Sequence, residues 1–582
     1  MDLTPVAHAI RVLSRSAFLA RRGLAPRPPT PSSNPPAGSV GSTAGSSVHS
    51  SGGPTRRNIL FVTVDQQRYD ALGVNGHPLT RTPVIDALAR RGVNYRRAHV
   101  QNVVCMPSRA TMLTGQHPLT HGVVSNGIPL DDDAPNVARL LRAAGYRTAL
   151  VGKAHFDPHL DLTLRYPENR RAAERDQTPW RGFDHAELAA HGPIGGHHYS
   201  AWLYEQHPED IAGFGAVLTG AGGGDTGAPE VVHNPIPRDH YHTDWVANRT
   251  ISWLRSLDAN APFFCWMSFP DPHHPFDPPE EEVRKRGDFR DRPLPSGHPG
   301  SAERIRAILA RRPRHWLDFY DGRFRNPEGG PTSFVPARLS DDQHREIDRA
   351  VQVENELIDD AMGRVLDVLA ELGRDADTDI IYTSDHGDLG GHAGLIFKGP
   401  YHVDALMRVP LIWRPAASAA VEPAVIDEPV GLVDLAPTFC AIAGIAPDAR
   451  MQGEALPTRT GSRRERVITT FDSQFAAVGM HLRTIYRDGW LCTVYEPSTV
   501  GQPNGLEKFF AETGLFGGGI GPISPIEYEG TEGELYAVDE DPHQFENRWD
   551  DPEYKAVRQD LVTDIYDTLP TERRVLEVER PA

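Results

Sequence analysis

The chain has 582 residues, of which 39% are hydrophobic, a length and composition typical of a globular enzyme with two or more domains. Its 60 basic and 78 acidic residues give a formal net charge of −18, which argues against nucleic acid as a partner of the whole surface. No run of apolar residues is long enough to span a membrane.

The cysteines are few and far apart, and none of them forms a Cys-x-x-Cys pair. We therefore expect neither a disulfide framework nor a cysteine-based zinc site. The four positions are Cys105, Cys265, Cys440 and Cys492.

Residues 1–55 differ in composition from the rest of the chain. They are rich in arginine, and from residue 26 onward they consist largely of Pro, Ser and Gly, which cannot build a hydrophobic core. The segment predicts either a disordered extension or a presequence for an organelle. Because it lacks the continuous apolar segment of a secretory signal, we expect a cytoplasmic protein, with organellar targeting as the alternative.

The first predicted element is a buried strand over residues 58–64, a β-branched and aromatic run that stops at Asp65 and Gln66. Ligands of open α/β sheets gather at the carboxyl ends of the strands. Carboxylate and amide oxygens at such a position suit a hard divalent cation. Taken alone, the Asp-Gln pair is better interpreted as a polar cap on a loop. A helix is predicted to open at Pro83.

The segment from Cys105 to Gly115 predicts an anion site. Pro107 is favourable in a first helical turn, and the residues after it continue a helix as far as Gly115. Cys105 is then at a helix N-terminus, where free backbone N–H groups attract an anion, and Arg109 returns to the same point one turn later. The alternative for a lone cysteine is a small side chain packed in the core.

Three further predicted strands end at charged or imidazole side chains, as the first one does. Side chains at the carboxyl ends of strands in one open sheet are expected to gather there. Carboxylates and imidazoles so placed suit metal binding and proton transfer. The strands and the side chains that follow them are 146–151 with Lys153 and His155, 262–269 with Asp271, His273 and His274, and 379–383 with Asp385 and His386.

Periodicity predicts the remaining elements. Predicted helices cover 135–144, 245–257, 340–372, 432–445 and 554–569, and further strands cover 409–413, 467–471, 481–486 and 490–495. Residues 161–240 and 280–335 show no sustained period, and we interpret 161–240 as loops around the mouth of a pocket.

Taken together, the motifs resemble those of the formylglycine-dependent (type I) sulfatases. They are Cys-x-Pro-Ser-Arg with a following Thr-Gly, starting at Cys105, then Gly-Lys-x-His ending at His155, and Pro-His-x-Pro around His273. The resemblance covers nearly everything after residue 57. It implies an α/β fold with an alkaline-phosphatase-like mixed sheet sandwiched by helices and a smaller C-terminal α+β domain carrying an antiparallel sheet. We therefore expect a catalytic domain over 56–460 and a C-terminal subdomain over 461–582.

In that family the signature cysteine is converted to formylglycine by a formylglycine-generating enzyme. One oxygen of the hydrated aldehyde attacks sulfur, and the second hydroxyl helps to expel sulfate. The resemblance therefore implies that Cys105 becomes the nucleophile and that Arg109 and Lys153 balance the charge of the nucleophile and the bound anion. It also implies that His155 accepts a proton from the diol.

The resemblance also assigns residues to the ester side and to substrate binding. His273 faces the ester oxygen, and Lys398 contacts a nonbridging oxygen and protonates the departing alcohol. Asn126 resembles the site asparagine of the family, and an ordinary Asn-Gly turn is an equally good interpretation of this pair. His402 stands where many relatives carry an acid, and it is a candidate substrate-binding residue.

The same resemblance implies a single divalent cation. Its ligands are Asp65, Gln66, Asp385 and His386, together with an oxygen of the modified Cys105. An oxygen-rich set favours Ca²⁺, whereas the imidazole and the amide keep Mn²⁺ as the alternative. Gln66 replaces the second aspartate of many sulfatases and so removes one negative charge from the metal shell.

The sequence therefore predicts a sulfuric ester hydrolase that acts on a small anionic sulfate ester. One alternative is a phosphonate monoester or phosphodiester hydrolase of the same superfamily, because the Asp-Gln and Asp-His metal pairs resemble that branch as well. A second alternative is an inactive binding homologue in which the thiol of Cys105 stays unconverted.

Overall fold

The computed structural model describes residues 56–159, 164–193, 197–219, 224–324, 326, 328, 334–473, 479–498 and 526–570. The described residues from Arg57 on belong to one compact unit. The predicted tail over 1–55 lies outside the described residues. None of the helices in the described part of the chain combines the length and the apolar composition that a membrane crossing needs.

An eight-stranded mixed sheet forms the centre of the molecule, with strand order β5-β4-β6-β1-β7-β8-β2-β9. Every neighbouring pair is parallel except the two pairs made by β8, which runs against both β7 and β2. The strands are β1 (Asn58–Val64), β2 (Val93–Tyr95), β4 (Arg147–Gly152), β5 (His185–Leu188), β6 (Phe263–Ser268), β7 (Thr378–Ser384), β8 (Leu411–Arg414) and β9 (Ala424–Ile426).

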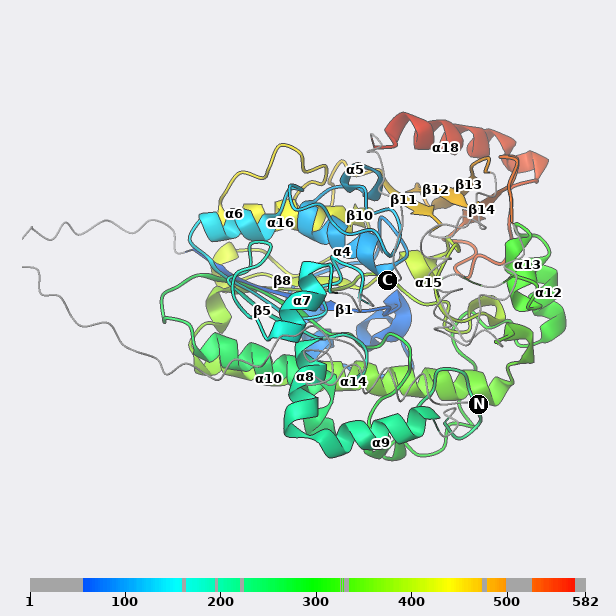
Figure 1. Cartoon of the computed structure of the whole chain (residues 1–582). Helices are drawn as coiled ribbons and strands as arrows, with labels where there is room; N and C mark the ends of the chain where they lie inside the picture. Colours follow the sequence, from blue (N-terminus) through cyan, green and yellow to red (C-terminus); the bar gives the residue numbers. More distant parts are fainter. Residues whose placement is uncertain are drawn as a thin grey trace, which may run out of the picture. The chain divides into compact units, whose positions relative to one another are not determined.

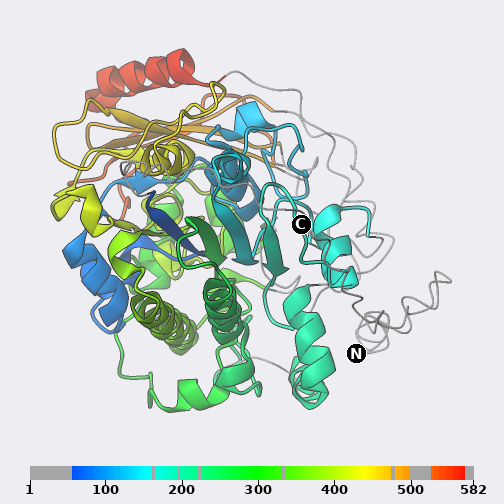
Figure 2. The ribbon, with the colours of Figure 1, turned by 90° about the vertical axis from the view of Figure 1, so that its left-hand side faces the viewer.

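Helices cover both faces of this sheet, as Figures 1 and 2 show. In β1, Ile59 and Phe61 join the core on one side, while Leu60 and Val62 join the core on the other. Burial on both faces explains the continuous apolar run of this strand. One layer contains α4 (Cys105–Thr114), α6 (Val137–Ala143) and α16 (Leu435–Ala443), and the other contains α3 (Pro83–Arg91), α10 (His242–Arg255) and α14 (Asp341–Glu371).

A second, antiparallel sheet follows in the order β11-β12-β13-β14. On one face, Ile485 and Cys492 pack against Leu561 and Ile565 of α18 (Lys555–Thr568). Side chains on the opposite face join the main core, so this sheet belongs to the same compact unit. Its strands are β11 (Arg466–Asp472), β12 (His481–Arg487), β13 (Trp490–Tyr495) and β14 (Gly533–Ala537), and a separate parallel pair joins β3 (Ala98–His99) to β10 (Val430–Gly431).

The fold class expected from the resemblance is therefore confirmed, and the predicted long helices are present with ends shifted by a few residues. The prediction of irregular structure over 161–240 and 280–335 is wrong. Most elements there are too short to display a hydrophobic period, and local caps hold some of them: the Ser301 side chain accepts from the N–H of Arg304. They are α7 (Pro167–Glu174), β5, α8 (His198–Gln206), α9 (Pro208–Thr219), α11 (Glu280–Arg284), α12 (Ala302–Leu309) and α13 (His315–Tyr320), while α5 (Pro118–His121) and α15 (Asp404–Met407) are short helices elsewhere.

Candidate active site

Neighbouring parallel strands bring the predicted acidic ligands together. Val64 pairs with Ser384 in the register of β1 and β7, so Asp65 and Asp385 follow at the same edge of the sheet. The N–H of Asp385 donates to the carbonyl of Val64 (3.2 Å), and the N–H of Asp65 donates to the carbonyl of Asp271 beyond β6 (2.9 Å). The carboxyl ends of three adjacent strands are thus tied to one another, where the topology of such sheets places ligands.

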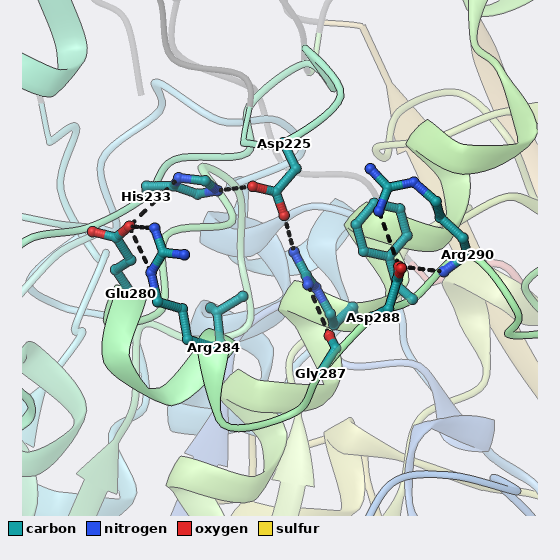
Figure 3. Close-up of a pocket in the computed structure, with 10 residues that line it drawn as sticks. Asp225, His233, Glu280, Arg284, Gly287, Asp288 and Arg290 are labelled. Atoms are coloured by element: carbon teal, nitrogen blue, oxygen red, sulfur yellow. Dashed lines mark hydrogen bonds and ion pairs between the residues drawn. The ribbon is translucent and has the colours of Figure 1, made fainter.

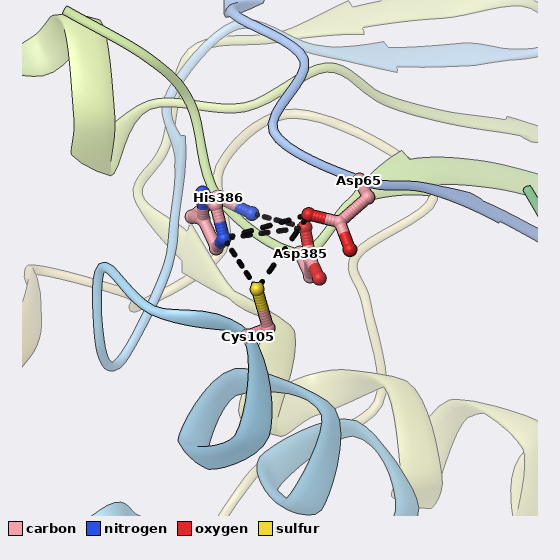
Figure 4. Close-up of side chains that lie close together, drawn as sticks. All are labelled: Asp65, Cys105, Asp385 and His386. Atoms are coloured by element: carbon pink, nitrogen blue, oxygen red, sulfur yellow. Dashed lines mark hydrogen bonds and ion pairs between the residues drawn. The ribbon is translucent and has the colours of Figure 1, made fainter. Parts of the chain in front are cut away.

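Helix α4 begins at Cys105, and all of its residues are buried. It ends at Gly115, whose φ of 65° lies in the left-handed region that favours glycine. The Sγ atom of Cys105 lies 3.1 Å from Nε2 of His386 and 3.6 Å from Oδ1 of Asp65. Figure 4 shows these side chains, together with Asp385, converging on one point from three separate segments. Their ligand atoms all lie within 4.8 Å of one another.

Arg109 is fully buried and joins the two carboxylates. Its Nε donates to Oδ2 of Asp385 (2.7 Å), and its Nη2 donates to Oδ2 of Asp65 (3.4 Å). Its Nη1 donates to the carbonyl of Lys153 and to Oγ of Ser268, both at 2.8 Å. Burial opposes the charge of the guanidinium, but the two carboxylates outweigh it and raise the pKa of Arg109. Arg109 therefore fixes the carboxylate positions.

Two lysine amines approach the same cluster. Nζ of Lys153 forms an ion pair with Asp65. Nζ of Lys398 lies 3.1 Å from Sγ of Cys105 and also contacts Nε2 of His273. Burial disfavours the charged amine, but Cys105 and Asp65 outweigh burial and raise the pKa of Lys398. Lys398 is therefore a charged donor beside the thiol.

The surroundings shift the pKa values of Asp65 and Cys105 in opposite directions. Burial opposes the ionisation of Asp65, but Lys153 and Arg109 outweigh it and hold the pKa of Asp65 well below its usual value. Burial raises the pKa of Cys105 to about 11, and the charge of Asp65 adds to this effect. At neutral pH the unmodified thiol is therefore protonated, and it is a weak nucleophile in that form.

Gln66 lies at the edge of the cluster with φ = 66°, in the left-handed region. Its Oε1 accepts from Nζ of Lys398 (3.2 Å), and its Nε2 donates to the carboxylate of Asp388 and lies 3.1 Å from Nδ1 of His274. Its backbone N–H donates to Oδ1 of Asp385 (3.1 Å). The amide oxygen of Gln66 therefore faces the lysine that contacts Cys105.

His191 belongs to this cluster, although it lies in the range 161–240 that the sequence predicted to be loops around the mouth of a pocket. Its Nε2 accepts from Nζ of Lys153 (2.8 Å), and its ring stacks on His273 with centroids 3.9 Å apart. The residue comes three positions after β5, which ends at Leu188 at the same edge of the sheet. Recognition of β5 as a strand would have identified His191 by the rule that identified Lys153 and His273.

Asn126 supports the first turn of α4. Its Oδ1 accepts from the N–H of Met106 (3.0 Å), and its Nδ2 donates to Oε2 of Glu328 (2.9 Å). Burial raises the pKa of Glu328. Asn126 thus binds the residue that directly follows Cys105. It also contacts the buried carboxyl group of Glu328, which the sequence analysis did not identify.

Two predicted site residues have their closest ring or hydrogen-bond contacts outside the cluster, although the charges of Lys153, Arg109 and Lys398 still act on His155. The ring of His155 is buried and stacks on His159 with centroids 3.6 Å apart. His402 is buried, and its Nδ1 lies 2.6 Å from Oγ1 of Thr484 in the C-terminal sheet. Among the described residues, no hydrogen bond joins either imidazole to Cys105 or to its carboxylate and lysine neighbours.

A model of the Sulfatase family matches residues 57–445. The chain belongs to the sulfatase family. This sulfatase is 29% identical over 403 residues to the uncharacterized sulfatase YidJ of Escherichia coli (strain K12), covering 69% of this chain and 70% of that protein. It is 29% identical over 410 residues to an arylsulfatase of Clostridium perfringens (strain 13 / Type A), covering 69% of this chain and 77% of that one. The family is one of hydrolases acting on sulfuric ester bonds, and the chain is such a hydrolase.

A solved structure shows the same fold. The phosphonate monoester hydrolase of Agrobacterium radiobacter superposes on this sulfatase with a TM-score of 0.67 and 24% sequence identity. The match covers 88% of this chain and 95% of that chain. The mixed sheet and the C-terminal antiparallel sheet of this chain are therefore part of a fold that the two proteins share.

The donor set of this sulfatase fits a divalent cation beside Cys105. Asp65, Asp385 and His386 are fully buried, and their ligand atoms converge with the thiol. Oδ1 of Asp65 lies 3.6 Å from Nε2 of His386, and Oδ1 of Asp385 lies 3.8 Å from the same nitrogen. Carboxylate oxygens suit Ca²⁺ and Mg²⁺, and an imidazole extends the choice to Mn²⁺.

A pocket of about 280 Å³ lies elsewhere in this sulfatase, and Figure 3 shows its lining. Its charged side chains pair with one another: Asp225 lies 3.4 Å from Nε2 of His233 and 3.1 Å from Nη2 of Arg349. Arg284 likewise pairs with Glu280. Because these charges are mutually compensated, the pocket gives no indication of a charged ligand.

Proposed function

We propose that this protein hydrolyses a sulfate monoester to an alcohol and sulfate, with Cys105 converted to formylglycine and one divalent cation, Ca²⁺ or alternatively Mn²⁺. The observation that carries the proposal is the position of Cys105. Its Sγ lies at the start of α4, 3.1 Å from both His386 Nε2 and Lys398 Nζ. A formylglycine-generating enzyme is the maturation partner that this proposal requires.

The residues around position 105 divide into those that hold the site and those that serve the reaction. Arg109 holds Asp65 and Asp385 in place through its hydrogen bonds. Asn126 holds the first turn of α4. When bound, the cation supplies Lewis-acid polarisation of a sulfate oxygen, and the hydrated formylglycine supplies the attacking oxygen.

The proton for the departing alcohol comes from Lys398 in this proposal. Burial and the neighbouring His191 lower the pKa of His273, so its ring is neutral at neutral pH. The neutral ring accepts from Nζ of Lys398, whose own pKa is raised. His273 thus orients the lysine towards the ester side, and Lys398 donates the proton.

Mass spectrometry tests the nucleophile directly. The protein is produced with and without a formylglycine-generating enzyme, and the peptide that contains Cys105 is analysed for loss of the thiol mass and gain of an aldehyde. Turnover of 4-nitrophenyl sulfate is expected only from converted protein. The Cys105→Ala variant is expected to lose roughly 10³-fold or more in kcat/KM. Substantial turnover by that variant would contradict the mechanism, and an active protein with an intact thiol would contradict the conversion.

Phosphonate monoester or phosphodiester hydrolysis is the second candidate, and Gln66 favours it. This residue brings a neutral amide to the cluster where many sulfatases carry a second aspartate, and its Oε1 faces Lys398. Values of kcat/KM for an aryl sulfate and an aryl phosphonate with the same leaving group decide between the two. A higher value for the phosphonate would replace the sulfatase proposal. A Cys105 thiol that stays unconverted in the presence of a formylglycine-generating enzyme, together with no turnover of either substrate, would favour an inactive binding homologue.

A further inference from the structure

We propose that His159, Glu168 and His197 form a second metal site, separate from the Asp65 cluster, for an ion of the Zn²⁺ class. His159 lies in the segment that follows β4, Glu168 lies in the first turn of α7, and His197 immediately precedes α8. The ligand atoms of the three side chains lie within 4.8 Å of one another. The proposal does not depend on which ester the protein hydrolyses.

The distances suit a small ion. Nε2 of His159 lies 3.4 Å from an oxygen of Glu168. Two ligands of a tetrahedral zinc ion, with bonds near 2.0–2.1 Å, are about 3.3 Å apart. The rings of His159 and His197 meet edge to face, with centroids 4.9 Å apart and an interplanar angle of 75°. Because these rings are not stacked, a nitrogen of each is able to approach the same point.

Burial without hydrogen bonds supports a ligand at this place. His197 is only 2% exposed, and neither of its ring nitrogens has a hydrogen-bond partner among the described residues. Glu168 is fully buried, and the side chain of His159 is 10% exposed. Buried polar atoms left without partners are costly, and metal coordination removes that cost.

The donor types select the ion. Two imidazole nitrogens and one carboxylate oxygen match the ligand sets of zinc, whereas Ca²⁺ takes six to eight oxygen ligands. The Asp65 cluster is richer in oxygen, so the two sites are expected to prefer different ions.

A bound ion would link the segments that carry His159, Glu168 and His197, next to the Lys153–His155 motif. One Glu168 oxygen accepts from the N–H of His155, and the other accepts from Phe156 and Asp157. The ring of His159 stacks on His155. The proposed site is therefore built onto the backbone that carries His155.

Metal analysis of the full-length protein tests the site. Chelator-treated protein is saturated with Ca²⁺, equilibrated with Zn²⁺, freed of excess ions by dialysis and analysed by atomic emission. We expect His197→Ala and His159→Ala each to lose one equivalent of Zn²⁺ relative to the unmodified chain. Glu168 is a poor choice for substitution because its carboxylate accepts hydrogen bonds from three backbone N–H groups, which the substitution would also remove.

The chain offers a matched control in the partly exposed group His207, Asp210 and His240, whose ligand atoms also lie within 4.8 Å of one another. His240→Ala is expected to keep the equivalent of Zn²⁺. Equal zinc content in His197→Ala and the unmodified chain would overturn the proposal, as would loss of the ion in His240→Ala alone.

A spectroscopic measurement on the unmodified chain covers the case in which the variants fail to fold. Co²⁺ bound at a nitrogen-rich site of low coordination number is expected to give strong visible absorption bands that excess Ca²⁺ does not remove. Weak bands typical of six oxygen ligands, or bands that Ca²⁺ abolishes, would overturn the proposal.

Discussion

Nζ of Lys398 and Sγ of Cys105 lie 3.1 Å apart, and both residues are buried. The same amine contacts His273, whose ring is neutral because its pKa is lowered. A charged donor is thus held beside residue 105, the nucleophile of the proposed reaction. This arrangement is consistent with the proposed role of Lys398 in proton transfer, and substitution of the lysine tests that role against binding alone.

Lys398→Met is expected to lower kcat/KM by about 10²–10⁴-fold for an alkyl sulfate, because the departing alkoxide needs a proton. The loss for 4-nitrophenyl sulfate is expected to be smaller, because 4-nitrophenolate leaves without one. Steady-state rates on the two esters measure the difference.

Lys285→Met is the control for this substitution, since that side chain is 61% exposed and pairs with Glu282. Its rates are expected to match those of the unmodified chain. An equal loss on both esters by Lys398→Met would mean that the lysine binds the anion and does not donate a proton.

Gln66→Glu is expected to destabilise the fold by about 1–3 kcal/mol near pH 8, because it places a carboxylate against Asp388 where an amide now donates. Burial already raises the pKa of Asp388. A carboxyl group whose pKa is raised by folding destabilises the protein increasingly as the pH rises through that pKa. The cost is therefore expected to be smaller at pH 5, because the pair of carboxyl groups binds a proton more readily as the pH falls and the protonated group then donates. Urea unfolding at both pH values measures it.

The double variant Gln66→Glu/Asp388→Asn is the matched test, because an asparagine amide restores a donor between the two side chains. Its unfolding free energy is expected to exceed that of Gln66→Glu and to depend less on pH. If the double variant is no more stable than the single one, the contact between residues 66 and 388 does not determine the effect.

Acidification is expected to destabilise the protein below about pH 6.5. Burial lowers the pKa values of His315, His344 and His402 from 6.5 to about 3. Between those values the unfolded chain binds protons that the folded chain does not, so stability is lost as the pH falls. Each such group contributes about 1.4 kcal/mol per pH unit. Urea unfolding from pH 7 to pH 5 measures the slope.

His344→Gln isolates one of these protons, since that residue lies in α14 away from the Asp65 cluster. The slope of its unfolding free energy against pH is expected to fall by about 1.4 kcal/mol per pH unit, which corresponds to one bound proton. An unchanged slope would show that His344 is protonated to the same extent in both states.

Removal of divalent ions by a chelator is expected to abolish turnover and to lower the melting temperature, because Asp65 and Asp385 are buried together. A ligand that binds only the folded state stabilises that state. Activity regained with Ca²⁺, or instead with Mn²⁺, identifies the ion. Asp65→Asn is expected to show no gain in melting temperature on Ca²⁺ addition, and full activity after chelation would exclude a required cation.

The site could be predicted in part because several of its residues directly follow apolar strands. Asp65 and Asp385 directly follow runs that are buried on both faces of the sheet, and His273 comes five residues after a third such run. His191 escaped prediction because β5 has only four residues, too few for a recognisable period.

The sequence by itself determined which residue types stand at the strand ends and at the start of α4, because apolar runs, proline and glycine act locally on the backbone. Only the tertiary structure decided that Gln66 faces Asp388 and that His402 contacts Thr484. It also decided that His159 and His197 meet at Glu168. Such contacts join segments through strand order and helix packing, which no local pattern encodes.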